Sequence, residues 1–88
     1  HFGKAEAYFE KAASTSVGDS NVYLALGQNQ LKLKDYGKAA ISLEKFVELT
    51  DRAALKPAVL NQIAICYEKL TSYDKALATY DRILALRP

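Results

Sequence analysis

Apolar positions along the chain recur at helical spacing, and no strand-like alternation extends beyond a few residues. In the stretch 20–34, apolar or small residues follow an i, i+3, i+4 pattern, which is typical of a helix with one buried face. These residues are Tyr23, Leu26, Gly27, Leu31 and Leu33. Pro57 suits the first turn of a helix, where its missing N–H is not needed. The pattern predicts five helices, at roughly 2–14, 20–34, 36–51, 57–70 and 73–86.

The predicted helices form an internal repeat. Phe2-Gly3-Lys4-Ala5 aligns with Tyr36-Gly37-Lys38-Ala39 at an offset of 34 residues. The second block aligns with Tyr73-Asp74-Lys75-Ala76 at an offset of 37, so three residues are inserted. We place the insertion in 51–56, as a loop or as an extension of the preceding helix. A period near 34 with aromatic, small and bulky residues in register indicates stacked helix–turn–helix units.

The repeat makes three local predictions. Gly27 and Ala64 are small at the point where two antiparallel helices come closest, so a larger side chain would force the helices apart. Asp35 and Ser72 precede the second helices of their repeats, where a short polar side chain can cap free amides. Aromatic residues recur at two repeat positions, which indicates core packing rather than platforms for single-stranded nucleic acid. They are Phe2, Tyr36 and Tyr73 at one position and Phe9 and Tyr80 at the other.

These units resemble the tetratricopeptide repeat family, whose pattern is an aromatic, Leu-Gly and Tyr on the first helix, then Ala, a bulky aromatic and Pro on the second. The middle unit has Tyr23, Leu26, Gly27, Gln30, Ala39 and Leu43, and the last has Leu60, Ile63, Ala64, Tyr67, Ala76, Tyr80 and Pro88. The departures are Gln30 for Tyr, Phe46 and Ile83 for Ala, and Asp51 for Pro. The resemblance implies an all-α fold of antiparallel helix–turn–helix repeats, stacked as a short right-handed α-solenoid.

The resemblance also divides the single domain, residues 1–88, into units. Residues 1–19 are expected to be the second helix of a partial repeat, and 20–56 and 57–88 are expected to be two whole repeats. Arrays of this kind bury each unit against its neighbours and need roughly three units with polar caps for stability. We therefore expect the chain to be an excerpt of a longer array.

Composition and charge exclude several functions. Half of the residues are hydrophobic and the net charge is +2 from mixed signs, which is typical of a globular chain and not of a nucleic-acid-binding or polybasic membrane surface. No apolar run approaches the ~18–20 residues of a membrane span. His1 is the one histidine, Cys66 is interpreted as a buried structural thiol, and Glu44 and Glu48 as a solvated helix face. We expect no catalytic residue, metal site, cofactor or enzymatic activity.

The functional surface that remains is the inner face of the stack. By resemblance, the first helix of each repeat lines a concave groove. The expected peptide-binding residues are Asn21, Leu24, Gln28, Leu31, Lys32, Asn61, Ile65 and Lys69, with Ala58 and Glu68 at two further groove positions. Amide side chains can donate to and accept from a peptide backbone, and Leu24 and Ile65 would supply apolar pockets. The family's clamp for carboxylates at peptide C-termini is not expected, because Leu24 and Gln28 stand where that clamp has Lys and Asn.

Two functions stay open at this point. One is a scaffold that binds a peptide or a segment of a partner protein through the groove. The other is a structural module whose repeats self-associate, or space other domains of a larger protein, through apolar residues at the two ends of the stack. A single unpaired cysteine is compatible with the cytosol and with export, so the compartment stays open, with the cytoplasm slightly favoured.

Overall fold

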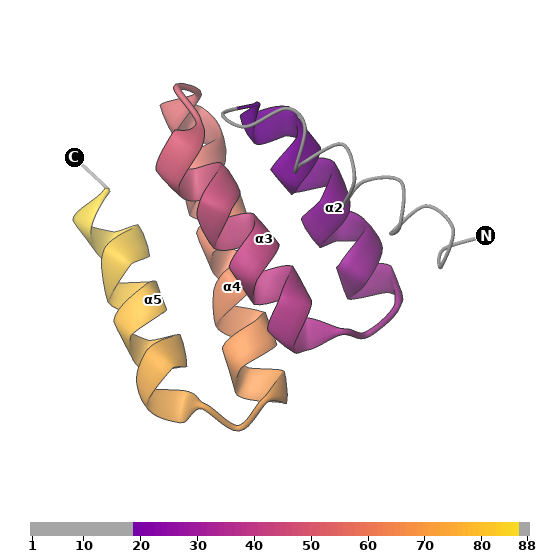
Figure 1. The fold of residues 1–88 in the computed structure, drawn as a ribbon. Helices are drawn as coiled ribbons and strands as arrows, with labels where there is room; N and C mark the ends of the chain where they lie inside the picture. Colours follow the sequence, from indigo (N-terminus) through magenta and orange to yellow (C-terminus); the bar gives the residue numbers. More distant parts are fainter. Residues whose placement is uncertain (1–18, 87–88) are drawn as a thin grey trace.

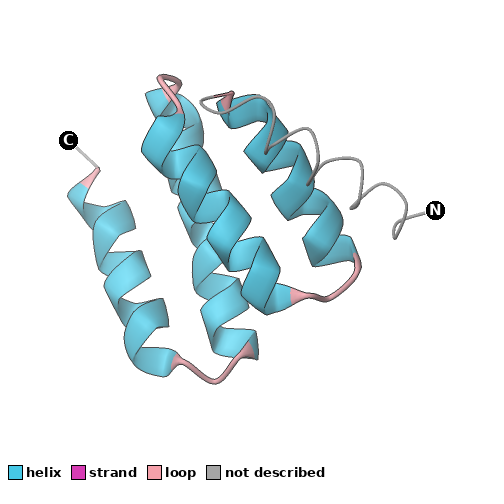
Figure 2. Cartoon of the chain, viewed as in Figure 1, coloured by secondary structure: helices cyan, strands magenta, loops and turns pink. Residues whose placement is uncertain are grey.

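The structure, a computed structural model, describes residues 19–86 and places four α-helices in them. These are α2 (Ser20–Lys32), α3 (Tyr36–Leu49), α4 (Lys56–Lys69) and α5 (Tyr73–Ala85), with a 3-10 turn, η1 (Ala53–Leu55), before α4. All four begin and end within two residues of their predicted bounds, and residues 19–86 contain no strand (Figure 2). The expected total of five helices is not matched, because the remaining one, 2–14, lies outside the described residues.

The helices form two antiparallel hairpins, α2–α3 and α4–α5, and α3 also packs against α4 (Figure 1). Both hairpin turns have the same backbone geometry. Lys34 and Thr71, which are equivalent in the two repeats, adopt left-handed φ angles of 61° and 58°. In each turn the next residue's N–H reaches back to a helix carbonyl, from Asp35 to Gln30 at 2.9 Å and from Ser72 to Tyr67 at 2.8 Å. This is the hydrogen bond that closes a helix with a left-handed residue after its end. The sequence repeat is therefore a structural repeat.

The hydrophobic core lies around α3 and α4. Leu43, Phe46, Leu60 and Ile63 are the largest apolar side chains that are fully buried there, together with the thiol of Cys66. The prediction of a buried cysteine is confirmed, and burial raises the pKa of its thiol. Because α3 contributes to the contact with both α2 and α4, it joins the two hairpins into one packed unit.

The predicted close approach at Gly27 is also confirmed. A Cβ atom at this position would lie 2.6 Å from Cδ2 and 2.7 Å from Cγ of Leu43, distances that packed atoms do not adopt without moving. Ala64 occupies the equivalent place on α4 and is fully buried. The absence of a side chain at Gly27 therefore lets α2 lie directly on Leu43 of α3.

Capping differs between the two repeats. The Asp35 carboxylate accepts a hydrogen bond from the N–H of Lys38 at 3.4 Å, as expected. Ser72 makes no such bond, so that prediction is wrong. The backbone angles of the two residues are nearly the same.

The inserted segment forms a loop with a short turn rather than an extension of α3. After Leu49 the chain becomes extended at Thr50, with ψ of 141°, and then turns through η1 into α4. The hydroxyl of Thr50 accepts a hydrogen bond from the N–H of Arg52 at 3.1 Å. Pro57 lies in the first turn of α4, as the sequence predicts.

Tyr73 contradicts the prediction that its repeat position is part of the core. Its side chain is 61% exposed, whereas the equivalent Tyr36 is half-buried against a cluster that includes Ala39 and Cys66. The difference arises because α4 covers this side of α3, while none of the described residues covers the same side of α5. Aligning the repeats identifies equivalent residues in the sequence, but equivalent residues can pack against different neighbours.

Candidate functional site

The eight expected binding residues lie on the two first helices of the hairpins, α2 and α4. The best evidence that these helices are side by side is a hydrogen bond between them, in which Nε2 of Gln28 donates to Oε1 of Gln62 at 2.8 Å. Both side chains are half-buried. We call the surface made by the eight residues the α2/α4 face. Gln62 was not among them, although it immediately follows Asn61.

The apolar members of the α2/α4 face are not equally available. Leu24 and Leu31 are half-buried and pack against the core, so most of their surface already supports the fold. Ile65 is 39% exposed and has the largest exposed fraction of the three. It lies one helical turn after Asn61, which is also exposed. The accessible apolar surface of this face is therefore centred on α4.

The polar members fall into two groups. Asn21 is tied to the loop between α3 and α4, because its Oδ1 accepts a short hydrogen bond from the guanidinium of Arg52. Sequence reasoning missed Arg52, which lies in the inserted loop. Lys32 and Lys69 are exposed in the last turns of α2 and α4. Positive charge at these helix ends is favoured by the negative end of each helix dipole.

Glu68 also lies on this side of α4, but a neighbouring helix holds its carboxylate. The hydroxyl of Tyr80 on α5 donates a hydrogen bond to Oε1 of Glu68. This bond raises the pKa of Tyr80. The eight residues themselves comprise three amides, three aliphatic side chains and two lysines, with no carboxylate. The arrangement can hydrogen-bond to a peptide backbone and attract a negative group at the lysine end.

A second polar cluster joins α3, α4 and α5, and it corrects the interpretation of Glu44 as part of a solvated face. Oε2 of Glu44 accepts from Nη1 of Arg82 at 2.9 Å and from the hydroxyl of Tyr67 at 3.4 Å. Nζ of Lys75 lies 5.8 Å from the centre of the Tyr67 ring. Burial and the Glu44 carboxylate raise the pKa of Tyr67. The cluster fixes the second hairpin against the first.

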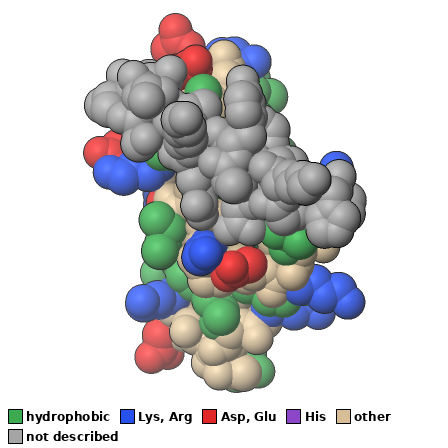
Figure 3. Space-filling view, turned by 45° about the vertical axis from the view of Figure 1, so that its right-hand side comes forward, with side chains coloured by type: hydrophobic (Ala, Val, Ile, Leu, Met, Phe, Trp, Pro, Cys, Tyr) green, Lys and Arg blue, Asp and Glu red, His purple; other side chains and the backbone are tan. Residues whose placement is uncertain are grey.

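The sequence does carry a signal for this cluster. Asp81 is the repeat equivalent of Glu44, and Lys45 is the equivalent of Arg82, so an acid and a base recur at neighbouring positions of the second helices. A position that carries the same sign of charge in both repeats is a candidate for a contact between repeats. Figure 3 shows acidic, basic and hydrophobic side chains interspersed on the described part of one face of the molecule.

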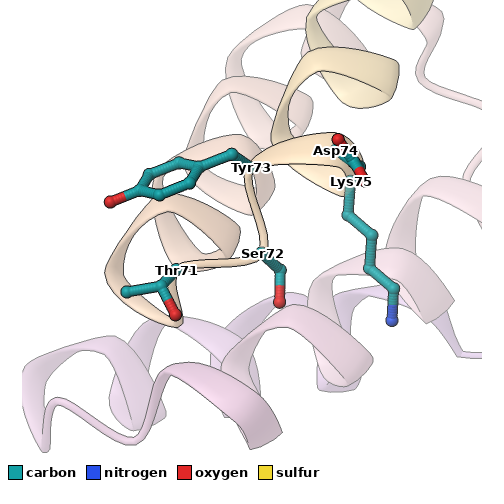
Figure 4. A pocket seen from close by; sticks show the side chains of 5 residues that line it. All are labelled: Thr71, Ser72, Tyr73, Asp74 and Lys75. Carbon is teal, nitrogen blue, oxygen red and sulfur yellow. The ribbon is translucent and has the colours of Figure 1, made fainter.

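The α4–α5 turn carries a shallow hollow of about 340 Å³ that is separate from the α2/α4 face (Figure 4). It is lined by five consecutive residues, 71–75, and the ring of Tyr73 and the ammonium group of Lys75 extend in different directions from it. The described residues contain no group of three or more His, Cys, Asp or Glu side chains placed to hold a metal ion. Within residues 19–86, none of the helices has the length and apolarity that crossing a bilayer requires.

Comparison with known families agrees with the structural repeat. Residues 20–51 and residues 59–88 each match a model described as tetratricopeptide repeat, and the two matches together cover well over half of the chain. The chain belongs to the tetratricopeptide repeat family. Comparison with curated proteins finds no match. Repeats of this family generally mediate protein–protein interaction and form non-enzymatic scaffolds. The partial repeat expected at 1–19 lies outside both matches and stays a prediction.

Proposed function

We propose that the α2/α4 face binds an extended segment of a partner protein. The observation that supports this proposal is the hydrogen bond from Gln28 to Gln62, because it joins an amide side chain of α2 to an amide side chain of α4. A segment that crosses this surface meets both repeats at once. It can exchange backbone hydrogen bonds with side-chain amides without a fixed sequence, which is how an extended peptide is held.

The chemistry of the face favours a particular kind of segment. The exposed part of Ile65 offers a contact for an apolar side chain, and Asn61 lies beside it to bind the backbone. Lys32 and Lys69 end the two helices on the same side of the stack, because α2 and α4 run in the same direction. We therefore expect the preferred segment to combine an apolar residue with an acidic residue near the lysine end.

The test is a binding measurement with a probe selected on the protein. A displayed library of random peptides is panned on the chain, and an enriched peptide is labelled and titrated by fluorescence anisotropy. Gln28→Glu and Asn61→Glu each add a carboxylate to the face and should weaken binding about tenfold, which corresponds to about 1.4 kcal/mol. Far-UV circular dichroism should show unchanged helix content.

Ala78→Glu is the matched control, because it adds one carboxylate to an exposed position of α5, away from the α2/α4 face. It should leave the dissociation constant unchanged. Binding that survives both face variants, or that falls equally with Ala78→Glu, refutes the proposal. Enrichment of peptides without acidic residues would remove the role given to the two lysines.

A further inference from the structure

Arg52 is an exposed residue of the loop between α3 and α4, and hydrogen bonds hold both its backbone and its side chain. Its N–H donates to Oγ1 of Thr50 at 3.1 Å. Its guanidinium donates a short hydrogen bond to Oδ1 of Asn21, which belongs to the α2/α4 face. A long side chain that is already held in place loses little further freedom when a ligand binds. Arg52 therefore presents a positioned positive charge at the end of the face where α2 begins.

The guanidinium of Arg52 keeps donors that its bond to Asn21 does not use. It carries five N–H groups, and this bond goes to a neutral amide oxygen. Among residues 19–86, no carboxylate forms an ion pair with Arg52. Asp19, which lies at the same end of α2, accepts the N–H of Asn21 at 3.0 Å instead. Arg52 can therefore bind a further carboxylate through two parallel N–H groups, a geometry that suits arginine.

Arg52 and the α2/α4 face do not lie at an end of the stack. The loop that carries Arg52 joins the two hairpins. On α4, the residues Asn61, Ile65 and Lys69 stay exposed although α3 packs against that helix. By the repeat alignment, the helix expected at 2–14 relates to α2 as α3 relates to α4. Packed in that way, it leaves the corresponding side of α2 open to a ligand.

The α2/α4 face carries positive charge at both ends. Lys32 and Lys69 lie in the last turns of α2 and α4, and Arg52 lies at the opposite end, bonded to the first turn of α2. The helix α2 has 13 residues, which at ~1.5 Å per residue separate the two ends by about 20 Å. An extended peptide advances ~3.3 Å per residue, so about six residues cover this distance. The exposed part of Ile65 lies between the two ends.

We infer that Arg52 determines specificity at the α2/α4 face by binding a carboxylate side chain of the partner segment. This inference rests on the proposed function and adds to it. The segment carries two acidic residues about six positions apart, one at Arg52 and one at the lysine end, with an apolar residue between them for Ile65. The carboxylate at Arg52 is that of a side chain, because Leu24 and Gln28 stand where the family's clamp for a chain terminus has Lys and Asn.

The experiment uses the full chain and peptides from a displayed library in which every peptide is fused at its C-terminus and so has no terminal carboxylate. We expect the enriched peptides to share two acidic residues at this spacing. Each acid is replaced in turn by its amide in a synthetic peptide with an amidated C-terminus, and binding is measured by fluorescence anisotropy. Arg52→Gln should weaken the parent peptide about fivefold, the effect of an exposed charge pair. It should have no further effect on one of the two amide peptides and its full effect on the other.

Lys45→Gln is the matched control. It removes one positive charge from an exposed position of α3, away from the α2/α4 face. The dissociation constants of all three peptides should be unchanged by this substitution.

The outcomes separate failure of this inference from failure of the proposed function. If Gln28→Glu and Asn61→Glu weaken binding but Arg52→Gln does not, the face binds its peptide without Arg52, and this inference alone is overturned. It is also overturned if Arg52→Gln weakens all three peptides equally, because Arg52 then pairs with neither acid. If binding survives all three substitutions on the face, the proposed function fails and this inference fails with it.

Discussion

Replacement of Gly27 by alanine adds one methyl group to the contact between α2 and α3. The new Cβ would lie 2.6 Å from Cδ2 and 2.7 Å from Cγ of Leu43, and 3.4 Å from the backbone nitrogen of Leu43. Leu43 is fully buried and packed among core residues, so a shift of its side chain would also displace neighbours in the core. Relief therefore requires Leu43 to repack or α2 and α3 to separate.

Two effects of opposite sign decide the size of the change. Alanine is a better helix former than glycine by about 1 kcal/mol, which stabilises α2. Overpacking a filled core costs about 1–3 kcal/mol. The net expectation is a free energy of unfolding that is unchanged or lower by up to about 2 kcal/mol, at about 4–8 °C of melting temperature per kcal/mol for a domain of this size.

The control is the same substitution at Gly37 on α3, where an added Cβ meets no atom within 4 Å. Gly37→Ala retains the gain in helix propensity without the clash. The difference between the two variants therefore isolates the contact with Leu43, and it should be about 1–3 kcal/mol in thermal and urea unfolding followed by far-UV circular dichroism. Equal melting temperatures for the two variants would show that α2 does not lie on Leu43, and the packing of the first hairpin would be wrong.

Three further substitutions or treatments test the rest of the fold. Glu44→Gln should lower the free energy of unfolding by at most about 1 kcal/mol, because the pair with Arg82 is part-exposed, and the loss should shrink in high salt; a loss that is unaffected by salt would contradict the ion pair. Ser42→Ala removes the hydroxyl that donates to the buried carboxamide of Gln30 at 2.7 Å and should cost about 1 kcal/mol, so no change in urea unfolding would argue against this bond. The thiol of Cys66 should react slowly with a thiol reagent in the native protein at neutral pH and rapidly in denaturant, and rapid labelling of the native protein would contradict its burial. Because burial raises the pKa of this thiol, its contribution to stability should be full below the ordinary thiol pKa and be lost as pH rises through the raised value.

The four described helices could be predicted because their signals are local. Each signal can be recognised within one or two turns of helix. The signals are the spacing of apolar residues, a proline in a first turn and a small residue where two helices come close. Gly27 is the clearest example, since glycine destabilises a helix, and its place on the apolar face therefore indicates a close contact with another helix. The offset between repeats then fixed which helices pair.

Contacts between repeats could not be predicted in the same way. The pattern along its own helix predicts that Glu44 is solvated, whereas its partner Arg82 comes from α5. Repeat alignment identifies the positions of the candidate binding site, but it does not show which of these side chains are hydrogen-bonded within the chain. Gln28 is bonded to Gln62 of α4, and Asn21 is bonded to Arg52 of the loop before α4, so both bonds depend on contacts that α2 makes with a later segment of the chain.

The most direct test of peptide binding by the α2/α4 face is a nuclear magnetic resonance titration of the isotope-labelled chain with the enriched peptide. The side-chain amide signals of Gln28 and Asn61 report on the face itself, and the backbone amide of Ile65 reports on the apolar contact beside them. We predict that these signals shift with a common dissociation constant while signals of the exposed residues of α3 and α5 stay in place. Shifts confined to α3 and α5, with the Gln28 and Asn61 amides unchanged at saturation, would contradict the account.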